Sequence, residues 1–176
     1  MLVMDLATDS VIRTLGEGVL KEPYQIAVFS VSQQEQLLFV MDKGDKEVKV
    51  LNVNSGAVVK SIGRGHLRDW CLELLLAPKL EGRLEDCFLY TSDDHRVSIF
   101  KPSDGSLVRV VGSVNTGSAP GQFNSPRGMA MYIPPGRGIS EGLLFVSDYG
   151  NHRVQVLNAE TLEFIRVLGK IGRAHV

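Results

Sequence analysis

The sequence predicts an all-β fold, a partial β-propeller of about three and a half four-stranded antiparallel blades. Short apolar runs rich in β-branched and aromatic residues are interrupted by Gly, Asn, Asp or Pro about every ten residues, as in sheets of short strands. Four segments also end alike, in a basic residue followed three positions later by glycine. Successive glycines are about 50 residues apart, close to the period of propeller repeats.

The shared endings divide the chain into repeats. The glycines are Gly16, Gly63, Gly112 and Gly169, and the basic residues before them are Arg13, Lys60, Arg109 and Arg166. We therefore expect the outer half of a blade at 1–16 and complete repeats at 17–63, 64–112 and 113–169. Residues 170–176 break the pattern, so we expect a non-native tail there. Because known propellers close with more blades than this, we expect a piece of a longer protein.

Each complete repeat contains a strongly apolar strand that ends at an aspartate. These strands precede Asp42, Asp93 and Asp148, and their continuous apolar character predicts burial on both faces. A shorter apolar strand lies before each of them, at 71–76 in the middle repeat. The apolar spacing over 67–76 leaves a helix open as an alternative there.

The composition favours a globular domain without a strong charge preference. Hydrophobic residues make up 44% and charged residues 22%, with a formal net charge of −1, which gives no electrostatic reason to expect a nucleic acid or an anionic membrane. No apolar run is long enough to span a bilayer and no signal peptide is visible, so we expect a cytoplasmic protein. Cys71 and Cys87 lie in apolar runs and are expected to be buried thiols.

One repeat carries a specific family resemblance. Its lead runs from Gly121 through Phe123 and Pro126 to Gly128, and its turn reads Asp148-Tyr-Gly-Asn-His-Arg153. This repeat closely resembles the NHL repeat. The first repeat has Asp45, Lys46 and Glu47 at the Asn, His and Arg places, and the middle repeat lacks the Pro-x-Gly lead. The resemblance implies a propeller that binds protein or RNA, as at the C-terminal end of tripartite-motif ubiquitin ligases.

The turn residues have a structural interpretation. An aspartate recurring once per repeat is better explained by backbone hydrogen bonds than by catalysis, and Gly can adopt positive φ in such a turn. Arg can lie over the blade with its guanidinium paired to a carboxylate. We therefore predict structural roles for Asp42, Asp93, Asp148, Gly150, Asn151 and Arg153.

A loop face is the expected place for binding. In an antiparallel blade, the loop into the first strand and the turn between the second and third strands lie at the same end. This groups the candidates Arg127, Asn124, Tyr149 and His152, with His95, Arg96, Lys43 and Lys46 on neighbouring blades. Such a basic rim with one aromatic side chain suits a peptide or single-stranded RNA, between which the sequence does not choose. An ordinary solvated face is the alternative, and no membrane or small-molecule partner is indicated.

Enzyme chemistry has little support in the sequence. The histidines show no short metal-ligand spacing, and no nucleophile elbow or phosphate-binding glycine loop is present, so we predict no catalytic residue, metal or cofactor. Relatives of the fold include amidating lyases and lactonases with a metal in the central channel. A fragment of such an enzyme is the alternative to a non-catalytic interaction module.

Overall fold

The computed structural model describes residues 1–5, 7–8, 10–69, 73–78 and 83–169. An N-terminal half-blade pairs β1 (Leu2–Asp5) with β2 (Ser10–Thr14). Blade 1 contains β3 (Pro23–Ser30), β4 (Gln36–Asp42), β5 (Glu47–Asn52) and β6 (Val58–Ile62). Blade 2 contains β7 (Glu73–Pro78), β8 (Cys87–Asp93), β9 (Arg96–Phe100) and β10 (Leu107–Gly112). Blade 3 contains β11 (Pro126–Tyr132), β12 (Leu143–Asp148), β13 (Arg153–Asn158) and β14 (Phe164–Leu168).

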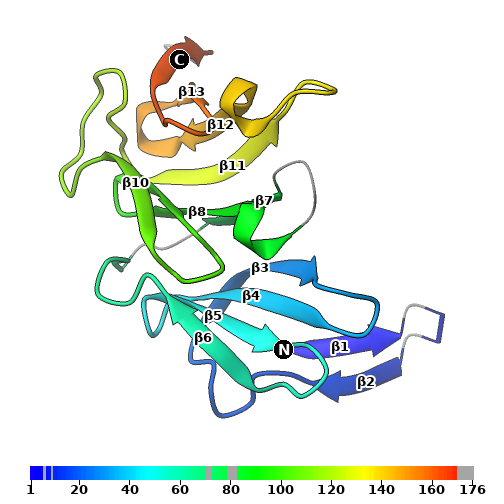
Figure 1. Cartoon of the computed structure of the whole chain (residues 1–176). Helices are drawn as coiled ribbons and strands as arrows, with labels where there is room; N and C mark the ends of the chain where they lie inside the picture. Colours follow the sequence, from blue (N-terminus) through cyan, green and yellow to red (C-terminus); the bar gives the residue numbers. More distant parts are fainter. Residues whose placement is uncertain (6, 9, 70–72, 79–82, 170–176) are drawn as a thin grey trace.

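The blades are antiparallel meanders stacked in chain order (Figure 1). In each blade the strands are hydrogen-bonded in sequence order, and the first strands β3, β7 and β11 contact one another between blades. Short 3₁₀ turns, η1 (Leu84–Asp86), η2 (Ile139–Glu141) and η3 (Tyr149–Asn151), connect strands. Three four-stranded sheets and one two-stranded sheet confirm the predicted partial β-propeller of three and a half blades.

The chain from residue 73 to 78 is a strand, so the helix considered over 67–76 is wrong for these residues. Glu73 is the first described residue of this strand, and Cys71, where the sequence predicts its start, lies outside the described residues, as does the tail at 170–176. Cys87 is buried, and its thiol donates to the carbonyl of Arg83 at 3.2 Å.

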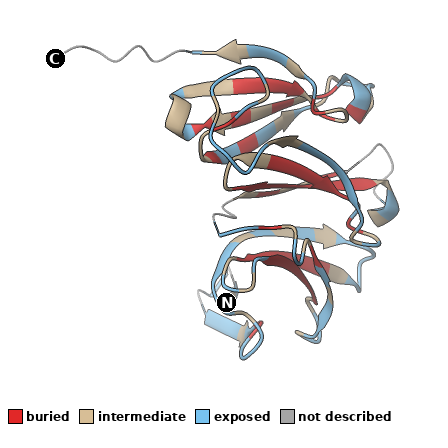
Figure 2. Ribbon diagram, turned by 90° about the vertical axis from the view of Figure 1, so that its left-hand side faces the viewer, coloured by how far each residue is buried: buried red, intermediate tan, exposed pale blue. Residues whose placement is uncertain are grey.

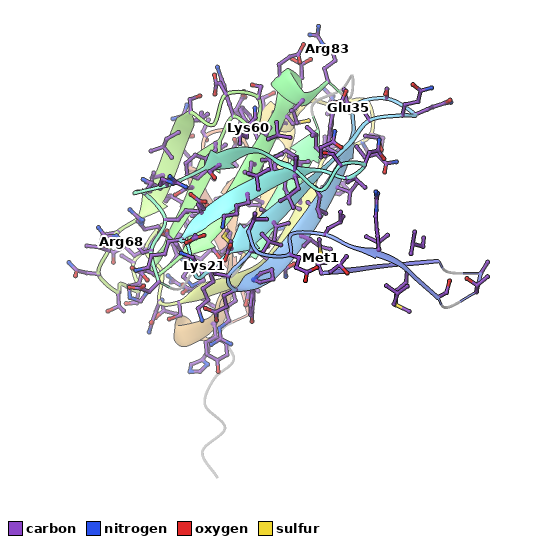
Figure 3. All side chains as sticks on the ribbon, turned by 90° about the horizontal axis from the view of Figure 1, so that it is seen from below. Met1, Lys21, Glu35, Lys60, Arg68 and Arg83 are labelled. Carbon is purple, nitrogen blue, oxygen red and sulfur yellow. The ribbon has the colours of Figure 1, made fainter. Side chains whose placement is uncertain are left out.

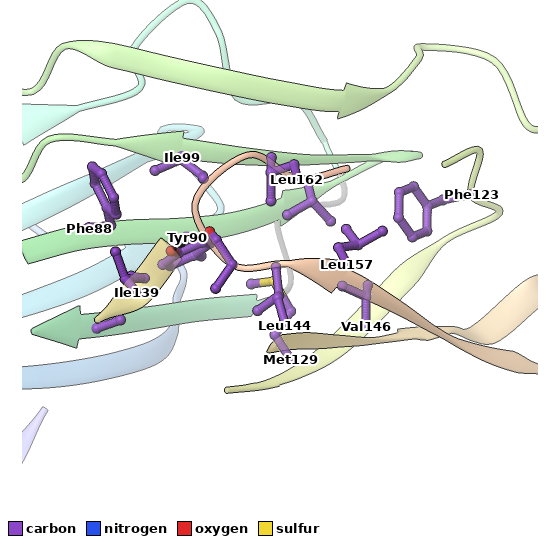
Figure 4. Close-up of a cluster of buried hydrophobic side chains, with 13 residues drawn as sticks. Phe88, Tyr90, Ile99, Phe123, Met129, Ile139, Leu144, Val146, Leu157 and Leu162 are labelled. Atoms are coloured by element: carbon purple, nitrogen blue, oxygen red, sulfur yellow. Dashed lines mark hydrogen bonds between the residues drawn. The ribbon is translucent and has the colours of Figure 1, made fainter. Parts of the chain in front are cut away.

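Three apolar cores lie between neighbouring sheets. The first joins the half-blade to blade 1, the second joins blades 1 and 2, and the third joins blades 2 and 3 (Figures 2 and 4). The second strands of blades 1 and 2 are buried along almost their whole length because a sheet covers each face. In β12 buried and half-buried residues alternate, so one face of blade 3 is only partly covered.

Candidate functional site

In blade 3 the site is organised around the carboxylate of Asp148, which is fully buried at the end of β12. It accepts a hydrogen bond of 2.8 Å from the backbone amide of Asn124, in the loop that leads into β11. Its other partners are Asn151 Nδ2 at 2.9 Å, Arg153 Nε at 2.7 Å and Gln155 Nε2 at 3.1 Å. A buried carboxylate needs this many donors to offset the loss of its hydration. Asp148 therefore joins the loop, the turn and the third strand.

The partners of Asp148 also hold the long loop that precedes Phe123. Asn151 Nδ2 donates to the carbonyl of Gly117 at 2.8 Å, and Arg153 donates to the carbonyls of Ser118 and Gln122 at 2.7 and 2.9 Å. The guanidinium suits this task because its donors form a rigid fork. These contacts occupy Asn151 and Arg153 within the blade.

Asp93 occupies the corresponding place in blade 2. Asp93 accepts a hydrogen bond of 3.0 Å from the backbone amide of Arg68 and forms an ion pair with Arg96. Arg96 also donates to the carbonyl of His66 at 2.8 Å. The Arg96 side chain is only 11% exposed. The expectation that Arg96 belongs to an exposed binding rim is therefore wrong, because its charge is committed to Asp93 inside the blade.

Blade 1 builds the same anchor from different residues. Asp42 accepts bonds from the backbone amides of Lys21 and Glu22 at 3.0 and 2.8 Å, and from Lys49 Nζ at 2.8 Å. Glu47 stands opposite Asp42, where Arg153 stands opposite Asp148. The cation that pairs with the aspartate of blade 1 is Lys49, two residues after Glu47 on the same strand.

The anchor of blade 1 therefore contains two fully buried carboxylates, Asp42 and Glu47. Burial raises the pKa of Asp42, but the bonds from Lys49 and the backbone amides outweigh it and lower the pKa overall. For Glu47 burial also raises the pKa, and Arg64 and Ser61 more than compensate, so its pKa is lowered. Burial lowers the pKa of Lys49, but the hydrogen bonds to Asp42 and Asp45 raise it by more. The pKa of Lys49 is therefore raised overall.

The tight turn of blade 3 differs from expectation at Gly150. The residue with positive φ is His152, at 53°, whereas Gly150 lies in the 3₁₀ turn η3 without positive φ. Gly150 is required for another reason, since a Cβ there would lie 2.4 Å from Cγ of Asn124. The backbone amide of Gly150 also donates to the carbonyl of Asn124 at 2.8 Å. The glycine thus permits close approach of the loop rather than an unusual backbone angle.

Arg127 and Tyr149 form the exposed part of the site. The guanidinium carbon of Arg127 lies 3.9 Å from the centroid of the Tyr149 ring, and the Tyr149 side chain is 54% exposed. A cavity of about 480 Å³ opens beside this stack. The cavity is mainly apolar and is lined by Ser147, Asp148, Tyr149, His152, Arg153, Val154, Leu168 and Gly169. The structure therefore brings Arg127, Tyr149 and His152 together, with Asn124 next to the turn.

The other rim candidates are engaged with neighbouring groups. Lys43 Nζ lies 3.2 Å from Glu22 Oε1, and Lys46 forms an ion pair with Asp69. Nδ1 of His95 accepts a bond of 3.1 Å from the backbone amide of Ser125. The positive charges of Lys43 and Lys46 on the expected basic rim are therefore paired with carboxylates, and His95 links blade 2 to the loop that leads into β11.

Sequence reasoning missed Lys49, Gln155 and Leu168. Lys49 and Gln155 could have been identified from their position, since each lies seven residues after the aspartate, Asp42 or Asp148, between two apolar residues. A long polar side chain in a buried strand needs a hydrogen-bond partner. Leu168 had a signal in the repeated aliphatic residue before glycine. Among the described residues, no cluster of three or more His, Cys, Asp or Glu side chains could hold a metal ion. None of the helices within the described ranges has the length and apolarity to cross a membrane.

No protein-family model and no curated protein matches the chain. Among solved structures, it is similar to an auxiliary nutrient binding protein from Bacteroides thetaiotaomicron, with a TM-score of 0.55 and 9% identity over 97% of this chain and 52% of that one. It is also similar to Kuenenia stuttgartiensis hydrazine synthase, with a TM-score of 0.53 and 18% identity over 84% of this chain and 36% of that one. For the dihydro-heme d1 dehydrogenase NirN the TM-score is 0.51 and the identity 16%, over 98% of this chain and 29% of that one.

These are similarities of fold. The chain spans between about a third and a half of the length of these structures, and its sequence identity to each is low. At such identities a shared architecture does not carry a shared activity.

Proposed function

We propose that this chain is a non-catalytic interaction module, an NHL-type β-propeller scaffold that binds a protein partner through the loop face of blade 3. The supporting observation is the exposed stack of Arg127 on Tyr149 at the edge of a mainly apolar cavity. Tyr and Arg are enriched at the energetically dominant positions of protein interfaces. The NHL resemblance adds the expectation of a role within a larger protein, such as one of the ubiquitin-ligase kind.

The charges of the rim favour a protein over single-stranded RNA. RNA binding draws most of its affinity from cations that contact phosphates. On this rim, Lys43 and Lys46 pair with Glu22 and Asp69, and Arg96 pairs with Asp93 inside the blade. An RNA strand would have to compete with these carboxylates, whereas a peptide can use the aromatic ring and the apolar wall of the cavity.

The test is a selection of binders from a displayed random-peptide library, run beside a random single-stranded RNA pool. Affinities of the selected ligands are then measured for the wild-type chain, Arg127→Ala, Tyr149→Ala and Tyr132→Ala. Tyr132 is the matched control, since it is a comparably exposed tyrosine of the same blade that lies outside the cavity.

We expect peptide ligands whose affinity falls about 30-fold with Tyr149→Ala, as for an interface residue contributing about 2 kcal/mol, and is unchanged with Tyr132→Ala. Two results would overturn the proposal. One is selection of RNA alone, with loss of binding in Tyr149→Ala. The other is peptide binding that neither rim substitution weakens.

A further inference from the structure

Each blade carries a small socket on the face that it turns toward the next blade. The socket consists of neighbouring residues on the second, third and fourth strands, together with the glycine that ends the fourth strand. Its members are Met41, Val48, Ile62 and Gly63 in blade 1, and Ser92, Val97, Val111 and Gly112 in blade 2.

The next blade fills each socket with one large apolar side chain. Leu67 of blade 2 lies among the residues of the first socket, and a Cβ on Gly63 would be 2.8 Å from it. Phe123 of blade 3 fills the second socket in the same way, 3.1 Å from a Cβ on Gly112. A Cβ on Gly16 of the half-blade would lie 2.2 Å from Leu20 of blade 1.

The three filling residues share a local sequence. Each follows a glycine at positive φ by two positions, which gives Gly-x-Leu or Gly-x-Phe: Gly18-Val19-Leu20, Gly65-His66-Leu67 and Gly121-Gln122-Phe123. A glycine in this conformation lets the loop turn sharply enough to direct the next side chain between two sheets.

A polar contact fixes the loop beside two of these filling residues, or plugs, Leu67 and Phe123. The residue before the third strand touches the residue two positions after the plug: Lys46 pairs with Asp69, and His95 accepts a bond of 3.1 Å from the amide of Ser125. His152 has the corresponding place in blade 3.

The basic residue of each outer strand makes a third contact. It donates to a backbone carbonyl in the last turn of the next blade: Arg13 to Asn54 at 2.7 Å, Lys60 to Pro102 at 3.3 Å and Arg109 to Glu160 at 3.2 Å (Lys60 is labelled in Figure 3). Arg166 is the fourth member of the series and is exposed.

Blade 3 presents all three features without a neighbouring blade among the described residues. Its socket residues, Ser147, Val154, Leu168 and Gly169, line the 480 Å³ cavity together with His152. Within the described part of the chain, no atom lies within 4 Å of a Cβ placed on Gly169. A Cβ on the corresponding glycines, Gly16, Gly63 and Gly112, would instead contact the filling side chain of the next blade.

We propose that this socket binds a Gly-x-Leu or Gly-x-Phe loop of a partner polypeptide, with Leu or Phe in the cavity. The partner places a polar residue two positions later against His152 and a backbone carbonyl at Arg166. A second copy of this chain does not supply the loop, because Leu20, Leu67 and Phe123 are inserted in their own sockets, and the further Gly-x-Leu with positive φ, at 105–107, is a hairpin turn whose leucine begins strand β10. The inference rests on the proposed protein-binding function and specifies the chemistry of the partner.

The test uses a synthetic peptide with the sequence of residues 117–127, which contains the Gly121-Gln122-Phe123 plug. It is titrated into the isotopically labelled chain and followed by NMR. We expect shifts of the Val154 and Leu168 methyl groups and of the His152 ring, with at least tenfold weaker binding for the peptide in which Phe is replaced by Ala. This comparison leaves the protein unchanged, so it does not depend on the folding of any variant.

Leu168→Asp on the protein should abolish the shifts, while Ile165→Asp, an exposed position on the same strand, should not. Equal shifts with both peptides, or none with either, would overturn the inference. Library-selected peptides that need Tyr149 but tolerate Leu168→Asp would overturn it while leaving the proposed function in place.

Discussion

Lys49 Nζ lies 2.8 Å from Oδ2 of Asp42, at the strand position that Gln155 takes beside Asp148 in blade 3. Glu47 takes the position of Arg153. In blade 3 the cation that contacts the aspartate is the first residue of the third strand, whereas in blade 1 it is the third residue of that strand.

This relationship predicts a rescue by double substitution. Lys49→Gln alone leaves the buried carboxylate of Asp42 without a cation, while Glu47 keeps its ion pair with Arg64, and should lower the free energy of unfolding by about 3 kcal/mol. Glu47→Arg with Lys49→Gln restores the arrangement of blade 3, so at least half of that loss should return. Urea unfolding of the wild type, both single variants and the double variant gives the coupling energy. Additive effects would contradict the equivalence of the two anchors.

Acid should destabilise the chain through the anchor of blade 1. The folded-state pKa values of Asp42 and Glu47 are both lowered, so these groups stabilise the fold above their unfolded pKa values of about 4. That contribution is lost as the pH falls through the lower folded pKa values. Urea midpoints between neutral pH and strong acid should therefore fall most steeply below about pH 4. Glu47→Gln should reduce this slope, and Glu163→Gln, at an exposed glutamate, should leave it unchanged.

Gly63→Ala should cost more than Gly65→Ala. Both glycines have positive φ, 79° and 75°, so both variants carry a backbone strain of about 1 kcal/mol. Only at Gly63 would the new methyl group lie 2.8 Å from Leu67, whereas Gly65 faces open space among the described atoms. Overpacking of this kind adds about 1–3 kcal/mol. Equal midpoints for the two variants in thermal unfolding would argue against a tightly filled socket.

Tyr90→Phe tests a bond between blades 2 and 3. The buried hydroxyl of Tyr90 donates to the carbonyl of Ala159 at 2.7 Å, and burial raises the pKa of Tyr90. Removing the hydroxyl leaves a buried carbonyl without this donor and should cost about 1–2 kcal/mol. Tyr132→Phe, at an exposed tyrosine, should be neutral in the same urea titration.

The fold could be predicted because its signals are local and repeated. Apolar runs, turn residues and the recurring basic residue and glycine each fix one strand or turn, and the aspartates Asp42, Asp93 and Asp148 mark the same place in every blade. The first strand of blade 2, predicted at 71–76 from its apolar run, is a strand over its described residues from Glu73 onward.

The site was harder to predict because its chemistry depends on contacts between distant residues. The sequence predicts that Arg153 pairs with a carboxylate, whereas it assigns Arg96 to the binding rim, and only the folded blade shows that Arg96 also faces a buried aspartate. The sequence places Arg127 and Tyr149 at one end of the blade, but it gives no sign of the stack between the guanidinium of Arg127, in β11, and the ring of Tyr149, in η3. The neutralisation of the rim by Glu22 and Asp69 could not be foreseen, because it joins separate turns and loops.

The three apolar cores, each confined to one pair of neighbouring sheets, give the molecule the cooperativity of a short linear array. Blade 2 lies between two complete blades and blade 1 between blade 2 and the half-blade, while the half-blade and blade 3 have one neighbour each among the described residues. Opening should therefore begin at the outer sheets and reach the middle last. In native-state hydrogen exchange, the amides of β8 and β9 should be the slowest, and protection should decrease toward both ends. A ligand seated on blade 3 would slow exchange at that end alone, which gives docking a signature along the backbone.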